Sequence, residues 1–373
     1  MEHKLKFPHR FSRSGALSAL GFLLALAALL AYPETVRQSV AQSIVYCLTA
    51  LTPSLFPYMA LASFAVRSPA SAFLGRFLRK PVRWLFRLPG CCGVPVFMSF
   101  LGGYPAGARG ASLLLEQGLI TQEQAGRMLL FCVNPGLAFA VSFIGFGVLG
   151  SPRLGLLLFA SVTLSGLLLG VITAFRAPLG PEPCPVERPM PLAPALMASV
   201  RDASRSTLMM CACVVLFSGF TSILLGSGLY GILAAKLART GLFSPFESAA
   251  VLAFLLEVTG GVGEAARFQC AGVFYAFGLA FGGLCVHLQV FSFFSEIPCK
   301  LWKFFLCRLV HGLMASGCFL LLGRLLPRGA VEALAPVGAG GGVFSGTLLG
   351  GGSLLLMCGA FLLLVEEGRK KAQ

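Results

Sequence analysis

The sequence predicts an all-α polytopic membrane protein, with about eight transmembrane helices plus two re-entrant hairpins in an inverted repeat. The first observation is compositional: the 373 residues are 57% hydrophobic and 12% charged, with a mean hydropathy of +0.85. That composition excludes a soluble globular domain. Secondly, charge-free apolar windows of membrane-spanning length recur along the chain. Thirdly, two apolar stretches contain glycine-rich breaks, which a membrane protein tolerates only inside protein or beside a wet cavity.

Seven charge-free windows are long enough to cross a bilayer. They cover residues 15–32, 39–66, 128–149, 154–175, 207–229, 268–295 and 348–365. A shorter eighth window, residues 309–323, is extended at its start by residues 302–308, whose charges are expected to snorkel. We expect the first window to be a retained anchor, because its apolar core spans a bilayer and no small-residue cleavage site stands out.

The net charge of +15 reports topology rather than a nucleic-acid partner, since the basic residues lie between apolar spans. Two clusters, before the first span and after the second, contain Lys4, Lys6, Arg10, Arg13, Arg67, Arg76, Arg79, Lys80, Arg83 and Arg87. By the positive-inside rule both clusters are cytoplasmic. Following the crossings along the chain predicts that the N- and C-termini are cytoplasmic as well.

Five segments follow from these signals. Residues 1–38 form an N-terminal anchor helix, 39–175 a first repeat, 176–206 a cytoplasmic proline-rich linker with an amphipathic segment, 207–323 a second, inverted repeat, and 324–373 an outer loop with a C-terminal transmembrane helix. Within the first repeat, residues 72–88 predict a basic amphipathic surface helix. Thr121 and Gln124 predict a capping box at the start of the next helix. Residues 230–242 predict a short surface helix in the second repeat.

The two repeats are predicted from a sequence similarity between their broken segments. SFLGGYPAGARGA and LLEVTGGVGEAAR share an apolar half, a glycine pair and a small-residue helix that carries one arginine. A second break follows each hairpin, at residues 134–136 and at residues 282–283. Because the first repeat begins by crossing inward and the second by crossing outward, the repeats are inverted, as in alternating-access carriers. The alternative is a chance similarity between two glycine-rich apolar segments.

The first hairpin carries the clearest candidate site. Free backbone N–H groups from Gly103 to Gly107 begin a short helix, whose positive end suits an anionic group. Arg109 follows two residues later and adds a positive charge, while Tyr104 offers an orienting hydroxyl or ring. Together they favour a carboxylate ligand. The alternative is structural: the glycines permit a close helix crossing and Arg109 snorkels to the cytoplasmic surface.

Two candidates stand where the chain breaks or carries an isolated charge. Asn134 precedes a proline, so its amide either replaces lost backbone partners or faces a ligand. Glu257 stands in a run otherwise free of charge, where an ionisable group is costly unless paired or hydrated. Its open roles are pairing with Arg109 or Arg267, binding a coupling cation, and taking up a proton.

The remaining candidates are Thr259, His287 and Gln289. His287 and Gln289 are two residues apart, so they face one cavity only if the backbone unwinds after Gly282. The sequence contains no C-x-x-C motif and no histidine at zinc-site spacing from a cysteine, so no metal or other cofactor is expected. No P-loop, dinucleotide fingerprint or nucleophile elbow is present, so we do not expect an enzyme.

A resemblance to known proteins lies in the segment GGYPAGA and in the segment LLLEQGLITQEQAGRMLLFCVNPG that follows it. In these segments the chain resembles the nucleoside-recognition (Gate) domain membrane proteins, and within them the YlbJ (SpoVV) family of sporulation integral membrane proteins. LLEVTGG and GGLCVHLQV in the second half are also similar to that family. The family motif maps onto Gly103, Tyr104, Pro105, Gly107 and Ala108, and less directly onto Glu257, His287 and Gln289.

The resemblance implies a transporter-like protein related to the gating half of concentrative nucleoside transporters. By this resemblance it moves a small organic anion, dipicolinate during sporulation, by alternating access in a bacterial plasma or forespore membrane. Its expected partners are that anionic substrate, the lipid bilayer, a coupling proton or cation, and a further copy of the chain in a homo-oligomer. The alternatives are a non-transporting scaffold for sporulation or envelope assembly and a nucleoside transporter.

The topology yields a direct test. A cysteine introduced at Pro183, in the proline-rich linker, should resist a membrane-impermeant thiol reagent in intact cells, because the positive-inside rule places the linker in the cytoplasm. The same cysteine should react after the cells are opened. The unaltered chain, with its thirteen native cysteines, provides the background signal. Labelling of residue 183 from outside intact cells would contradict the inverted-repeat topology.

Overall fold

The computed structural model describes residues 13–175, 177–178 and 190–325, and every regular element in these residues is helical. The first half contains α1 (Arg13–Ala31), α2 (Pro33–Tyr46), the π-helix η1 (Cys47–Leu51), α3 (Thr52–Arg67), α4 (Ala70–Phe86), η2 (Gly90–Cys92), α5 (Gly93–Leu101), α6 (Tyr104–Glu116), α7 (Gln122–Phe131), the π-helix η3 (Phe139–Val148) and α8 (Pro152–Ala174). The second half contains α9 (Leu192–Gly226), α10 (Leu229–Ala238), α11 (Pro245–Leu256), α12 (Val258–Arg267), α13 (Gly272–Phe281), α14 (Gly283–Phe291) and α15 (Leu301–Leu325).

A polytopic membrane protein is confirmed by the length and apolar character of these helices. Five described stretches can cross a membrane: Pro33–Phe64, Pro152–Ala174, Leu192–Gly226, Gly272–Phe291 and Leu301–Leu325. The pair formed by Phe73–Phe86 and Gly90–Leu101, bent by 108°, makes a sixth if it counts as one span. This count covers the described residues only, and the other predicted spans are accounted for as follows. The first window forms a shorter apolar helix, residues 128–149 are split by a break, and residues 348–365 lie outside the described part.

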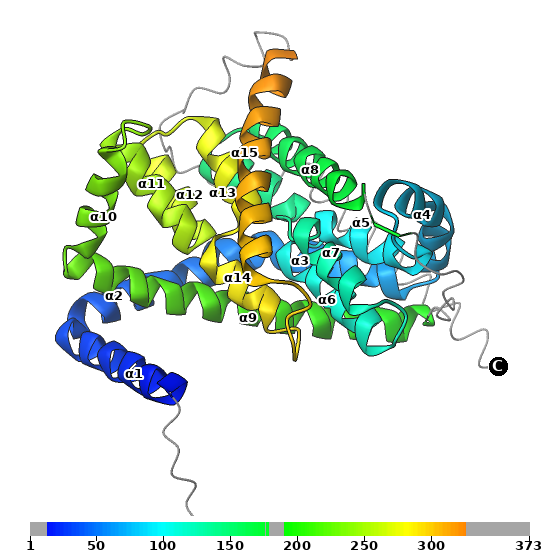
Figure 1. The fold of residues 1–373 in the computed structure, drawn as a ribbon, viewed down its shortest axis with the longest axis horizontal. Helices are drawn as coiled ribbons and strands as arrows, with labels where there is room; N and C mark the ends of the chain where they lie inside the picture. Colours follow the sequence, from blue (N-terminus) through cyan, green and yellow to red (C-terminus); the bar gives the residue numbers. More distant parts are fainter. Residues whose placement is uncertain (1–12, 176, 179–189, 326–373) are drawn as a thin grey trace, which may run out of the picture.

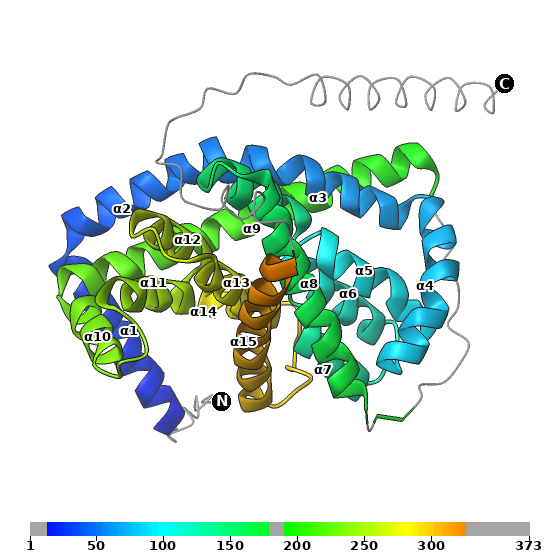
Figure 2. The same ribbon diagram turned by 90° about the horizontal axis from the view of Figure 1, so that it is seen from above.

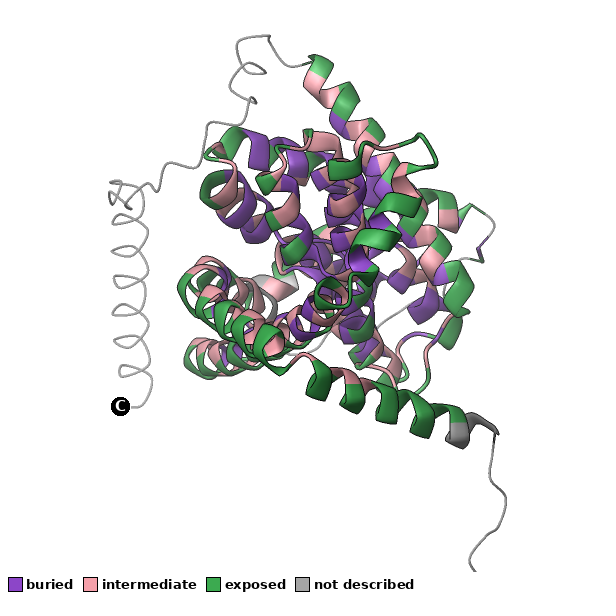
Figure 3. Cartoon of the chain, turned by 90° about the vertical axis from the view of Figure 1, so that its left-hand side faces the viewer, coloured by how far each residue is buried: buried purple, intermediate pink, exposed green. Residues whose placement is uncertain are grey.

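Exposed residues lie mainly on the outer helices and buried residues in the middle of the molecule (Figure 3), and many of the exposed residues are apolar. On α1, Leu17, Phe22, Leu24 and Leu30 are all more than half exposed. In water such a surface would be costly, whereas lipid chains solvate it without penalty. The exposed apolar surface therefore agrees with helices that face lipid.

The order of elements repeats between the two halves. Each half contains a long helix, a short helix, a helix pair broken at a hairpin tip, a second broken pair, and a long closing helix. The long helix of the first half, α2–η1–α3, runs antiparallel to α9: Ser39 contacts Ser218 at 2.7 Å near one end, and Ser63 donates to Asp202 near the other. The short helices α4 and α10 lie at opposite ends of the molecule (Figures 1 and 2). These directions are consistent with the predicted inverted repeat.

Local signals explain where the helices start. The predicted capping box is confirmed, since Gln124 N donates to Thr121 Oγ1 at 3.2 Å and Thr121 N donates to Gln124 Oε1 at 2.9 Å. The predicted short surface helix corresponds to α10. By contrast, α9 begins at Leu192, so the boundary predicted at residue 207 falls inside one continuous helix of 35 residues. No proline or glycine interrupts α9 between residues 195 and 218, which lets the helix continue through the boundary.

The first hairpin packs on the break after α7 by direct backbone contact. A Cβ atom at Gly107 would lie 2.0 Å from the carbonyl oxygen of Cys132 and 2.6 Å from the Cβ of Ser99. Gly136 is similarly tight, because a Cβ there would lie 2.8 Å from the carbonyl oxygen of Leu101. These glycines let the hairpin and the broken span approach more closely than any other residue would allow.

We predict that Gly107→Ala lowers the free energy of unfolding by about 1–3 kcal/mol, because the added methyl group overlaps the Cys132 carbonyl. The matched control is Gly231→Ala on α10, where nothing lies within 4 Å of the added Cβ. That change should be neutral, or stabilising by about 0.5–1 kcal/mol through helix propensity. Thermal denaturation in detergent measures both. Equal stabilities for the two variants would disprove the close approach at Gly107.

Candidate functional site

A small cavity of about 50 Å³, here called the chamber, lies where the breaks of the two halves meet. Its wall includes five of the nine predicted site residues: Gly103, Tyr104, Glu257, Thr259 and Gln289. The first two belong to the first hairpin, and the other three belong to the second half of the chain. The structure therefore brings predicted residues from both halves to one place, although they are more than 150 residues apart in sequence.

Tyr104 links the two halves beside the chamber. Its buried side chain leaves the first turn of α6, and its hydroxyl donates to the carbonyl oxygen of Leu279 at 2.9 Å. Leu279 lies in the last turn of α13, where helix carbonyls lack intrahelical partners. The positive φ of Gly103, 91°, turns the chain into α6 just before the tyrosine. The hydroxyl proton of Tyr104 is thus engaged by the second half of the chain.

Glu257 caps the second hairpin helix. Its Oε1 accepts from Thr259 N at 2.8 Å, and its Oε2 accepts from Gly260 N at 2.7 Å and from the Thr259 hydroxyl. The buried carboxylate therefore occupies the positive N-terminus of α12. Neither ion pair considered for it forms, because Arg109 pairs with Asp202 and Arg267 lies 3.5 Å from Glu264.

The structure separates His287 from the chamber. Helix α14 starts at Gly283 and is regular, so His287 and Gln289 point to different sides. His287 Nε2 lies 2.8 Å from the carbonyl oxygen of Phe281, and aromatic rings surround the imidazole, including those of Phe304 and Phe305. Gln289 lines the chamber and donates to the sulfur of Cys285. The condition for both side chains to face one cavity, an unwound backbone after Gly282, is not met at these residues.

Asn134 replaces backbone partners at the break after α7. Its Nδ2 donates to the carbonyl oxygen of Phe131 at 2.7 Å and approaches Ser99 Oγ at 3.4 Å. Its Oδ1 is buried without a hydrogen-bond partner in the described residues. Its Nδ2 thus replaces a lost backbone partner, and the ligand role of Asn134 stays a prediction. Gly107, also predicted as a site residue, packs against the same break and lines neither cavity described here.

Sequence analysis missed Arg308, which was expected to snorkel. Its side chain is fully buried, donates to the carbonyl oxygen of Val133, and contacts His311 Nδ1. Among the described residues no acidic side chain forms a salt bridge with it. The guanidinium sits at the negative C-terminal end of α7, where freed carbonyls favour a cation. An arginine and a histidine one turn apart in an apolar helix are the sequence signal for this cluster.

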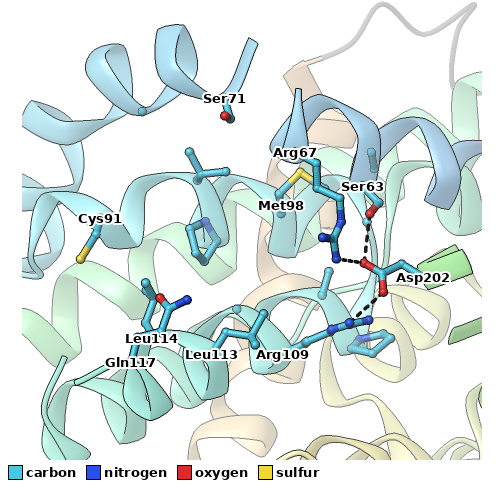
Figure 4. A pocket seen from close by; sticks show the side chains of 18 of the residues that line it. Ser63, Arg67, Ser71, Cys91, Met98, Arg109, Leu113, Leu114, Gln117 and Asp202 are labelled. Carbon is cyan, nitrogen blue, oxygen red and sulfur yellow. Dashed lines mark hydrogen bonds and ion pairs between the residues drawn. The ribbon is translucent and has the colours of Figure 1, made fainter. Parts of the chain in front are cut away.

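A second, larger cavity of about 520 Å³, here called the vestibule, lies between α3, α4, α5, α6 and α9 (Figure 4). Its polar lining comprises Ser63, Arg67, Ser71, Arg76, Arg79, Arg109, Gln117, Asp202 and Ser206. Met59, Gly102 and Pro105 line both cavities, so the vestibule reaches the first hairpin tip and shares a wall with the chamber. Arg109 belongs to the vestibule and not to the chamber.

Asp202 stands at the centre of the charged part of the vestibule (Figure 4). Its Oδ1 accepts from Arg109 at 2.8 Å, and its Oδ2 pairs with Arg67 and accepts from Ser63 at 3.4 Å. One carboxylate thereby connects α3, α6 and α9. Sequence reasoning did not single out Asp202, because it assigned residue 202 to a linker. In the described part of the chain, no three His, Cys, Asp or Glu side chains group closely enough to hold a metal ion.

The buried arginine can be tested through stability. Arg308→Met should lower the free energy of unfolding by about 1–3 kcal/mol, because the Val133 carbonyl and the His311 ring lose their buried donor. Arg324→Met, at an exposed position of the same helix, should stay within about 0.5 kcal/mol of the unaltered protein. Denaturation of both variants in one detergent makes the comparison. An Arg308→Met protein as stable as its control would show that the guanidinium does not support the break.

Comparison with known proteins finds a similar membrane protein. The chain is 24% identical over 338 residues to the sporulation integral membrane protein YlbJ of Bacillus subtilis (strain 168), and the match covers 83% of each chain. No family model matches the sequence, so no Gate domain is identified in this way. No solved structure matches it either. The chain is therefore an integral membrane protein similar to YlbJ over most of its length.

Proposed function

We propose that this protein is a membrane carrier that moves a small organic anion by alternating access between its two halves. The observation that carries the proposal is the meeting of both helix breaks at the chamber, with the basic vestibule against the same hairpin tip. Broken helices at the interface of two repeats are a common way to build a transport site. In this proposal the vestibule end faces the cytoplasm, because α4 carries the basic cluster.

Charge in the vestibule favours an anionic substrate. Four arginines and one aspartate line it in the described residues, so its wall has a net charge of about +3. A volume of about 520 Å³ falls within the range of small-molecule sites. The chamber, at about 50 Å³, has room for a few water molecules and is too small for an organic ion. The substrate therefore enters the vestibule first, and the chamber must enlarge before the substrate passes.

Glu257 is suited to couple transport to a proton or a cation. Its carboxylate holds the start of α12 through three hydrogen bonds. A proton or a cation on the carboxylate would weaken these bonds, because it withdraws the negative charge that the N–H groups stabilise. The second hairpin would then be released at the moment the chamber gains a positive charge. Both a proton and a cation fit this role, as in the sequence analysis.

Within the class of small anions, we propose dipicolinate. The name of the B. subtilis relative assigns that protein to sporulation. Dipicolinate carries two carboxylates, and the paired arginines of the vestibule match a dianion better than an uncharged nucleoside. The corresponding location is the plasma or forespore membrane of a bacterium, with both termini in the cytoplasm.

A scaffold without transport activity is the second candidate. The tight backbone contacts at Gly107 and Gly136 favour it, since glycines packed helix against helix also build rigid membrane proteins. The chamber between the breaks is correspondingly small. A scaffold requires the packing alone, whereas a carrier requires the first hairpin to move.

Uptake by reconstituted vesicles separates the two candidates. Gly103→Leu should abolish uptake of labelled dipicolinate while the protein remains folded, because Gly103 has a positive φ and adjoins the chamber. The control is Gly263→Leu on α12, where nothing lies within 4 Å of the added Cβ, and uptake should persist. Size-exclusion chromatography checks folding. Absence of uptake by the unaltered protein, or normal uptake by Gly103→Leu, would count against the carrier proposal.

A further inference from the structure

The vestibule arginines that the transport proposal uses are already paired with a carboxylate of the chain itself. Asp202 on α9 holds Arg67 at the end of α3 and Arg109 in the middle of α6, one oxygen for each guanidinium. Ser63 adds a hydrogen bond to the oxygen that Arg67 uses. The carboxylate thus links the first hairpin to the antiparallel pair of long helices.

Water reaches this cluster. The exposed fractions of the side chains are 31% for Arg67, 30% for Arg109 and 20% for Asp202, and all three line the vestibule. Ion pairs that water reaches are weak, since the solvent screens the attraction and solvates the separated charges. The arrangement can therefore exchange one carboxylate for another without leaving a buried charge alone.

Among the described residues that line the vestibule, positive charges outnumber negative ones. Two guanidinium groups share the single carboxylate of Asp202, and Arg76 and Arg79 add two further cations to the same wall. A guanidinium binds a carboxylate best when it has that group to itself in a bidentate pair. A ligand with two carboxylates could give Arg67 and Arg109 one each, which Asp202 cannot.

We propose that the vestibule is a binding site for a dianion, a small dicarboxylate, and that Asp202 is an internal stand-in that the ligand displaces. The inference rests on the proposed function, because it assumes that the cargo is an anion. It deepens that proposal by naming the residues that first hold the ligand and the charge that the ligand must carry.

Displacement of Asp202 has a mechanical consequence. Arg109 lies one helical turn after Pro105, which lines both the vestibule and the chamber. While Asp202 holds Arg109, the first hairpin is tied to α9. A dianion that takes over the two arginines breaks this tie, so α6 is free to shift only when the vestibule is loaded. The same carboxylate therefore makes hairpin movement depend on ligand.

The test measures binding of dipicolinate to the purified full-length protein in detergent at fixed low salt, with the monocarboxylate picolinate as the comparison. Asp202→Asn should bind dipicolinate about tenfold more tightly, because the internal competitor loses its charge while the side chain keeps its size. A gain in affinity cannot result from misfolding. Arg67→Gln and Arg109→Gln should each weaken dipicolinate binding about tenfold and reduce its advantage over picolinate.

Arg239→Gln is the matched control, since Arg239 is an exposed arginine at the end of α10, remote from the vestibule residues along the fold (Figure 1). It should bind both ligands as the unaltered protein does. Unchanged or weaker dipicolinate binding by Asp202→Asn overturns the proposal, as does an equal response of all three arginine variants. If binding shifts as expected but vesicles show no uptake, the carrier proposal fails and the dianion site stands. If uptake is lost in Gly103→Leu but unchanged in the Asp202, Arg67 and Arg109 variants, the dianion site fails and the carrier proposal stands.

Discussion

The constraint on which this structure depends is that backbone groups freed by a helix break need partners inside the protein, because lipid offers none. Each break meets it differently. Glu257 accepts the N–H groups that begin α12, and Arg308 with Asn134 donates to the carbonyls that end α7. Tyr104 donates to the last turn of α13 and so joins the two halves. The few buried polar residues therefore serve mainly to satisfy backbone groups at the helix breaks, and only their remaining polar atoms can contact a ligand.

The difference between the local residues that cause a break and the distant residues that satisfy it explains which features could be predicted from the sequence. Gly103, Gly282 and the Asn134 segment are local signals, since they prevent a helix from continuing wherever they occur. The capping box at Thr121 is equally local. Consequently the helical class, the two broken segments in each half and the positions of the breaks followed from the chain alone. Which windows are continuous spans did not, because length and hydropathy do not separate a continuous span from one that a break divides, as happens within residues 128–149.

The site was only partly predictable, because partners from distant segments decide what a polar residue does. Arg308 stands one turn from His311 in sequence, but its burial follows from the approach of Val133, 175 residues away. His287 became a packing residue because Phe304 and Phe305 of α15 fold over it. Asp202 acquired its role because a helix, rather than a linker, brings it to Arg67 and Arg109. None of these long-range contacts produces a periodic pattern in the sequence.

The charges are also separated in a way that bears on how a carrier of this design would work. The vestibule is basic, whereas the chamber beyond the hairpin tip contains the carboxylate of Glu257 and no arginine among its described lining residues. An anion drawn into the vestibule therefore meets repulsion at the next step, because like charges in a poorly hydrated space repel strongly. Neutralising Glu257 removes that repulsion and, by loosening the start of α12, also gives the chamber room to grow. In the proposed carrier, substrate movement and the release of the second hairpin would then share one cause, the neutralisation of Glu257.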